Sequence, residues 1–179
     1  GVLDVRNAAA QMKACEALAV LAARSAENRK AITACEAIAP LVRLLGDGRR
    51  VRTETPQERA AAVLADLARL GENRLSIVKE GGAQALVAML SADSGQAQTH
   101  AAATLSHIAS VAINKQTVAD AGAIQPLVAL LSKGSFEARK FAMGALWHLA
   151  SSADNKTAMA SAGAIPLLVA HLSSDSSDA

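Results

Sequence analysis

Three histidines have the clearest capacity for metal or acid–base chemistry in this sequence. His100 and His107 are seven residues apart, and His148 follows His107 by 41 residues. On one helix, seven residues span about 10.5 Å along the axis, whereas zinc needs donor atoms about 2.0 to 2.1 Å from the ion. These histidines therefore predict no shared metal site, and we expect them to lie in a groove or on a surface.

The remaining reactive side chains form no recognisable catalytic set. Cys15 and Cys35 are the two thiols of the chain, and a structural zinc site needs about four ligands. Two such thiols are typical of a reducing, intracellular compartment. The sequence contains no glycine-rich phosphate loop, nucleophile elbow or paired-carboxylate motif. It predicts a protein that is not an enzyme and uses no cofactor.

Basic side chains occur in two notable sets, although 18 Lys and Arg against 16 Asp and Glu give a net charge of only +2. One set recurs along the chain: Arg29, Arg74, Lys115 and Lys156. The other is confined to one segment: Arg49, Arg50 and Arg52. The first set either marks an edge that meets anionic groups or is inherited with a repeat. The second is either a phosphate-binding loop or a flexible, solvated one. The small net charge by itself indicates neither nucleic acid nor an anionic membrane as a partner.

The elements that position these residues repeat along the sequence. Four asparagines, at spacings of 45, 41 and 41 residues, mark the copies: Asn28, Asn73, Asn114 and Asn155. Eight residues after the asparagine, three copies carry glycine and the first carries Glu36. This pattern predicts a short helix that has asparagine as its N-cap and ends in a left-handed turn.

Two further helices are predicted in each copy. The second carries runs such as Pro126-Leu127-Val128. The third is longer and alanine-rich, with copies at 14–22, 60–68, 101–109 and 142–150. In the second copy, Ala60, Leu64 and Leu67 lie on one helical face. With only 2% aromatic residues, the chain is expected to gain stability by stacking similar layers.

Three helices in about 41 residues, with segments such as Gly122-Ala123-Ile124 followed by a proline-leucine-valine core, resemble the armadillo family. The resemblance is nearest to vacuole-associated armadillo proteins and the armadillo regions of plant U-box ubiquitin ligases. It implies an all-α, right-handed α-solenoid. We expect one domain over residues 1–173. Its parts are a leading third helix (1–25), full repeats at 26–71, 72–112 and 113–153, and a partial repeat at 154–173. Residues 174–179 are expected to be a disordered tail.

The resemblance also indicates where a peptide would bind. In importin-α-like relatives, an asparagine on the third helix holds the peptide backbone, and a tryptophan four residues earlier stacks on Lys or Arg. The asparagine positions here hold Val20, Asp66, His107 and His148. The tryptophan positions hold Glu16, Ala62, Ala103 and Gly144. We therefore expect a groove that is not a typical reader of nuclear localisation signals.

Earlier on the same helical face lie Lys13, Arg59, His100 and Phe141. Together with Arg69, His107 and His148 they predict a mildly basic groove, suited to an acidic or amphipathic segment. The alternative is that these are ordinary solvated charges. Trp147 either anchors a ligand or packs toward the next repeat.

The functional hypothesis is a scaffold or adaptor that binds an extended or helical segment of another protein. The alternatives are the substrate-recognition region of a larger ubiquitin ligase, and binding of phospholipid or nucleic acid through the arginine loop. No apolar stretch approaches the length of a membrane span and no signal peptide is evident. We expect a cytoplasmic fragment, nuclear or membrane-associated if flanking segments direct it there. It is expected to be a monomer or a dimer formed through its ends.

Overall fold

The computed structural model describes residues 8–46, 48 and 51–173, which form helices and turns and contain no strand. The first helix is α1 (Ala8–Ala23). Three groups of three follow: α2 (Ala26–Ala34), α3 (Ile38–Leu45) and α4 (Pro56–Leu67); α5 (Gly71–Lys79), α6 (Gly82–Met89) and α7 (Gly95–Ala109); α8 (Ala112–Asp120), α9 (Ile124–Lys133) and α10 (Phe136–Leu149). The described part ends with α11 (Ala153–Ser161) and α12 (Ala164–Ser173). The all-α repeat prediction is confirmed.

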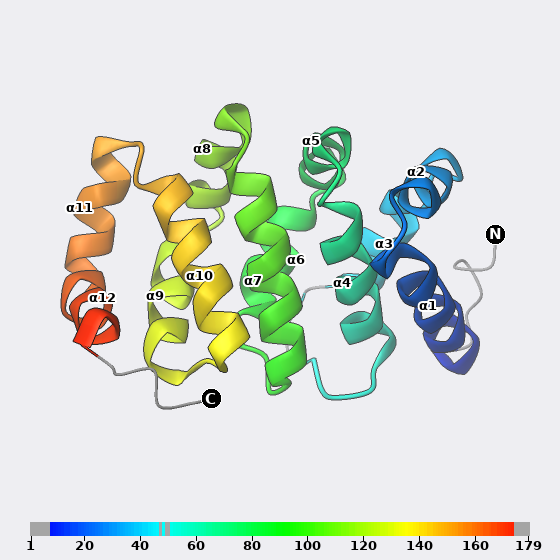
Figure 1. Cartoon of the computed structure of the whole chain (residues 1–179), viewed down its shortest axis with the longest axis horizontal. Coiled ribbons are helices and arrows are strands. Elements are labelled where there is room, and N and C mark those ends of the chain that lie inside the picture. Colours follow the sequence, from blue (N-terminus) through cyan, green and yellow to red (C-terminus); the bar gives the residue numbers. More distant parts are fainter. Residues whose placement is uncertain (1–7, 47, 49–50, 174–179) are drawn as a thin grey trace.

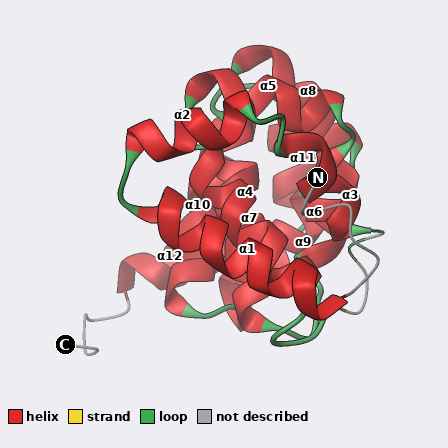
Figure 2. Ribbon diagram, turned by 90° about the vertical axis from the view of Figure 1, so that its right-hand side faces the viewer, coloured by secondary structure: helices red, strands yellow, loops and turns green. Residues whose placement is uncertain are grey.

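The helices are stacked so that equivalent members lie side by side (Figure 1). The long helices α1, α4, α7 and α10 form one layer, and α7 packs between α4 and α10. The short helices α2, α5 and α8 follow one edge of that layer, and α3, α6 and α9 lie behind it, whereas α11 and α12 close the left end of the stack (Figure 1). The view turned by 90° shows the same layers nearly end-on (Figure 2). The architecture is a solenoid.

The layers are held together by equivalent buried side chains. Leu64 and Leu105 are fully buried, and Leu146, the next in the 41-residue series, is 3% exposed. Alanines such as Ala60 and Ala101 are also fully buried. Because alanine has so little volume, the long helices can approach closely, and stability comes from repeated helix–helix contacts rather than one aromatic core. None of the described helices is long and apolar enough to cross a membrane.

The repeat asparagines do not have the N-cap role expected from the sequence. Asn73 is the third residue of α5, and the N-cap position is Leu70. The Asn73 side-chain amide instead donates to the carbonyl of Leu67, in the preceding helix, at 2.9 Å. Equivalent bonds run from Asn28 to Leu21, Asn114 to Ile108 and Asn155 to Leu149. The asparagine therefore satisfies a carbonyl at the end of the long helix and fixes the corner between successive repeats.

The glycines after the first short helix have the predicted left-handed backbone. Gly81, Gly122 and Gly163 have φ values of 80°, 81° and 80°. In the first copy, Glu36 occupies this position with φ 56°. A side chain with a Cβ atom is strained in this region.

Replacing Glu36 by glycine is therefore expected to raise the free energy of unfolding by about 0.5–1 kcal/mol. Glu36 is exposed, so no packing is lost. The measurement is urea denaturation followed by circular dichroism. Glu80→Gly is the control, because Glu80 is exposed and has φ −75°. Glu80→Gly should not raise the free energy of unfolding. A similar rise in both variants would contradict backbone strain at Glu36.

Candidate functional site

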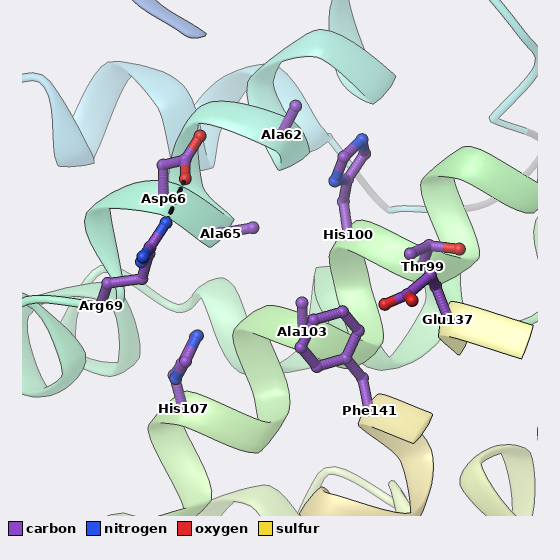
Figure 3. A pocket seen from close by; sticks show the side chains of 10 residues that line it. All are labelled: Ala62, Ala65, Asp66, Arg69, Thr99, His100, Ala103, His107, Glu137 and Phe141. Atoms are coloured by element: carbon purple, nitrogen blue, oxygen red, sulfur yellow. Dashed lines mark ion pairs between the residues drawn. The ribbon is translucent and has the colours of Figure 1, made fainter. Parts of the chain in front are cut away.

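The solvent-facing side of α1, α4, α7 and α10, which we call the third-helix face, contains a cavity of about 440 Å³. The lining residues come from α4, α7 and α10 and from the residues that follow α4: Ala62, Ala65, Asp66, Arg69, Thr99, His100, Ala103, His107, Glu137 and Phe141. The close-up view shows the labelled side chains around this space (Figure 3). Three successive copies of the long helix therefore contribute to one cavity.

The cavity exists because small and large side chains alternate across the face. Ala62 and Ala65 on α4 and Ala103 on α7 leave space between the helices. The ring of Phe141 on α10 and the imidazole of His100 on α7 stand beside it (Figure 3). The polar lining and the phenyl ring together suit an apolar side chain with polar neighbours.

The cations expected to make this face basic mostly have carboxylate partners. Lys13 Nζ lies 2.8 Å from Glu16 Oε2, and Arg59 Nε lies 3.7 Å from Glu16 Oε1. Arg69 Nη1 lies 3.6 Å from Asp66 Oδ1 (Figure 3). The hydrogen bond from Lys13, together with the charges of Lys13 and Arg59, lowers the pKa of Glu16. These ion pairs offset the positive charges of Lys13, Arg59 and Arg69 locally, and the mildly basic character of the whole groove stays a prediction.

The histidines on the face do not restore the positive charge at neutral pH. Burial lowers the pKa of His100, although Glu58 and Asp66 act in the opposite direction. Burial also lowers the pKa values of His107 and His148 below the ordinary value of 6.5, with contributions from nearby cations. All three imidazoles are mainly neutral at pH 7.

The structure separates the predicted groove residues into three groups. Asp66, Arg69, His100, His107 and Phe141 lie together around the cavity. A second group, between α1 and α4, consists of Lys13, Glu16 and Arg59. His148 lines a hollow of about 320 Å³ beside Lys115, Trp147, Ala150 and Ser151. Val20 stands apart, with 79% of its surface exposed.

The cavity also contains residues that were not predicted as site residues: its alanines and two polar residues, Thr99 and Glu137. The sequence contained a signal for two of the three alanines, because Ala62 and Ala103 occupy the positions that the importin-α resemblance marks for tryptophan. The absence of the large ring there leaves the space that the structure shows. Thr99 and Glu137 offered no such signal, because they lie outside the positions that the resemblance marks.

Trp147 is not buried against the next repeat, as the second interpretation supposed. Its side chain is 75% exposed. The indole lies beside the imidazole of His148, with ring centroids 4.7 Å apart and planes inclined by 54°. A ligand that reaches this hollow would change the surroundings of the indole.

The arginine segment is only partly described. Arg52 is exposed, and its backbone carbonyl accepts a hydrogen bond from Thr55 Oγ1 at 3.1 Å. Arg49 and Arg50 lie outside the described residues. The phosphate-binding interpretation of this segment stays a prediction.

Known protein families that resemble this chain agree with its helical repeat architecture. A family model described as the armadillo/beta-catenin-like repeat matches residues 72–110 and 112–151. No curated protein gives a significant match.

Several solved structures share the fold over nearly the whole chain. An engineered protein is 32% identical with a TM-score of 0.85, and the alignment covers 98% of this chain and 71% of that one. A designed armadillo repeat protein is 28% identical with a TM-score of 0.84, covering 98% and 73%. Another designed armadillo repeat protein, in complex with the peptide (KR)4, is 28% identical with a TM-score of 0.83, covering 99% and 74%.

Proposed function

Because this chain belongs to the armadillo repeat family, a fold that serves as a non-enzymatic binding scaffold, we propose that its third-helix face holds an extended segment of another protein. The cavity shared by α4, α7 and α10 is the observation that carries this proposal. A designed armadillo repeat protein of the same fold is known in complex with a peptide, which supports a peptide as the ligand.

The spacing of the long helices suits an extended ligand. Packed helices lie about 8–10 Å apart, and an extended chain rises about 3.3 Å per residue. Each long helix therefore meets every second or third residue of a peptide that crosses the layer. One apolar side chain of the ligand enters the cavity beside Phe141, and the neighbouring residues contact the adjacent helices.

The chemistry of the face favours an amphipathic segment. The alanines and Phe141 supply apolar contact. Asp66 and Arg69 form an ion pair at 3.6 Å. The cavity therefore does not favour a strongly charged side chain of the ligand. Acidic residues of the ligand would be placed outside it, where cations without carboxylate partners remain.

Filling the cavity is expected to abolish binding. In Ala65→Trp, an indole would occupy the space beside Phe141. We expect affinity for the best ligand of a peptide library to fall at least about tenfold, since a buried apolar side chain contributes about 1.5–3 kcal/mol. The measurement is fluorescence anisotropy of the labelled peptide.

The matched control is Ala129→Trp, which places the same ring on an exposed position of α9. Affinity should be retained in this variant, and circular dichroism should show both variants to be folded. Unchanged binding by folded Ala65→Trp would refute the cavity as the binding site.

A further inference from the structure

Two copies of the same three-residue arrangement lie along the edge of the third-helix face. The first consists of Arg74, His107 and Ser110, and the second of Lys115, His148 and Ser151. Each residue of the second set follows its counterpart by 41 residues, which is one repeat. We call these sets the rim subsites.

The hydrogen bonds within the two rim subsites are equivalent. Arg74 Nη1 donates to Ser110 Oγ at 2.9 Å, and Lys115 Nζ donates to Ser151 Oγ at 2.9 Å. Each serine hydroxyl then donates to the backbone carbonyl of its histidine, at 2.7 Å for His107 and 3.2 Å for His148. The cation on the first helix of a repeat is thereby fixed against the end of the long helix of the same repeat.

The positive charge of the rim subsites is not neutralised by a close ion pair. Among the described residues, no carboxylate lies within 4.0 Å of the Arg74 or Lys115 side-chain nitrogens. The field of these cations also acts on the neighbouring imidazoles. Burial first, and then the charges of Lys115 and Arg74, lower the pKa of His148. For His107, burial and the charges of Arg74, Arg69 and His148 lower the pKa, whereas Asp66 raises it.

Both cations retain donors for a ligand. Arg74 also donates from Nε to the carbonyl of Ala68 and from Nη2 to that of Arg69. Those two bonds and the one to Ser110 use three of the five N–H groups that a guanidinium carries. Lys115 uses one of its three N–H groups on Ser151. Both cations are partly buried, so their positions are held before a ligand arrives.

The neighbouring repeats do not carry the same arrangement. In the preceding copy, the equivalent of Arg74 is Arg29, which is buried and donates to the carbonyl of Ala22 at 2.7 Å. Asp66 and Arg69 stand there in place of the histidine and serine. In the following copy, Lys156 is exposed. The described chain therefore contains two rim subsites in adjacent repeats.

We propose that the two rim subsites bind two carboxylates of an acidic peptide segment that lies along the third-helix face. The inference rests on the proposed function and specifies the chemistry of its ligand. Because the subsites are one repeat apart, the two acidic residues are two or three positions apart in an extended peptide. Charge-assisted hydrogen bonds to carboxylates are the strong interactions that these donors can offer.

The test uses a short, end-blocked peptide probe with two glutamates three positions apart and leucine between them, and the same peptide with glutamines. Trp147 is the single tryptophan of the chain, and its ring lies 4.7 Å from that of His148. Its fluorescence therefore reports directly on the second subsite. We expect the glutamate peptide to bind more tightly than the glutamine peptide by about tenfold or more.

Removing either cation should weaken the glutamate peptide selectively. Arg74→Gln and Lys115→Gln are each expected to reduce its affinity about five- to tenfold, with little effect on the glutamine peptide. Lys156→Gln is the matched control, because it removes the same charge from the equivalent position one repeat later, where the side chain is exposed. It should leave the affinity within about twofold of the parent protein.

A change of pH provides a second readout. A bound carboxylate favours the protonated imidazole, so affinity for the glutamate peptide should rise as the pH falls from about 7.5 to about 5.5, where glutamate is still ionised. The glutamine peptide should show no such rise. Equal binding of both peptides by the parent, or unchanged affinity in Arg74→Gln and Lys115→Gln, would overturn the assignment. If those results were found and Ala65→Trp still abolished peptide binding, the proposed function would stand. Only the assignment of the rim subsites as carboxylate sites would be refuted.

Discussion

Replacing Leu105 by alanine is expected to lower the free energy of unfolding by about 3 kcal/mol. Leu105 is fully buried on α7, which packs against α4 on one side and α10 on the other. The substitution removes apolar contacts and leaves a cavity at the centre of the stack. Because each repeat of a solenoid contacts only its neighbours, a lesion there also weakens the coupling between the two ends.

The stability loss and the uncoupling can be measured together by urea denaturation. Circular dichroism follows all helices, and the fluorescence of Trp147 follows the surroundings of α10. The two transitions should coincide in the parent protein and separate in Leu105→Ala, because two-state behaviour is lost when coupling weakens. Leu172→Ala is the control, since Leu172 is 86% exposed, and it should change stability by less than about 0.5 kcal/mol. A loss below about 1 kcal/mol for Leu105→Ala would mean that the alanine-rich layers collapse into the vacated space.

The helices could be predicted because each copy repeats the same local signals. Gly81 and Gly122 mark a turn that requires a left-handed backbone, and the 41-residue period carries that assignment to Glu36, whose own side chain gives no such signal. The role of the asparagines could not be obtained in this way. Leu70 and Val111 occupy N-cap positions in α5 and α8 without a capping side chain, so the nearby asparagine looked like the cap. Its partner is a carbonyl of the preceding helix, which sequence spacing does not show.

The candidate site was predictable in position but not in charge. The period places Asp66, His107 and His148 on equivalent turns of the long helices, and two of the three line the cavity. The sign of the electrostatic field on the third-helix face depends on which side chains of different helices meet. Glu16 reaches Arg59 over 43 residues of sequence, and Lys115 reaches Ser151 over 36. Such pairings depend on helix packing and side-chain conformation, so the unpaired cations could be located only in the structure.

Replacing Asn73 by aspartate should destabilise the protein by at least about 3 kcal/mol at neutral pH. The Asn73 amide is 1% exposed and donates both to the Leu67 carbonyl and to Thr33 Oγ1, each at 2.9 Å. A carboxylate of the same shape has no hydrogen to donate and brings a buried negative charge against a carbonyl oxygen. Asn73→Ala, which loses the two bonds without adding charge, should cost about 2 kcal/mol.

The pH dependence separates the charge effect from the loss of the bonds. Burial beside a carbonyl should raise the folded-state pKa of the introduced aspartate above its unfolded value of about 3.9. The charge penalty is therefore present above the folded-state pKa and is lost as the pH falls through it, because a protonated carboxyl can donate to Leu67 again. The stability difference between Asn73→Asp and the parent, measured by urea denaturation, should shrink between about pH 7.5 and about pH 5, whereas the difference for Asn73→Ala should stay constant. Asn28→Asp is the matched control. Asn28 is half-buried, and its side-chain amide donates to the Leu21 carbonyl. An acidic residue in the first turn of α2 interacts favourably with the helix dipole. An equally large, pH-dependent loss of stability in Asn28→Asp would contradict this explanation. It would show that neither the burial of Asn73 nor its bond to Thr33 determines the destabilisation.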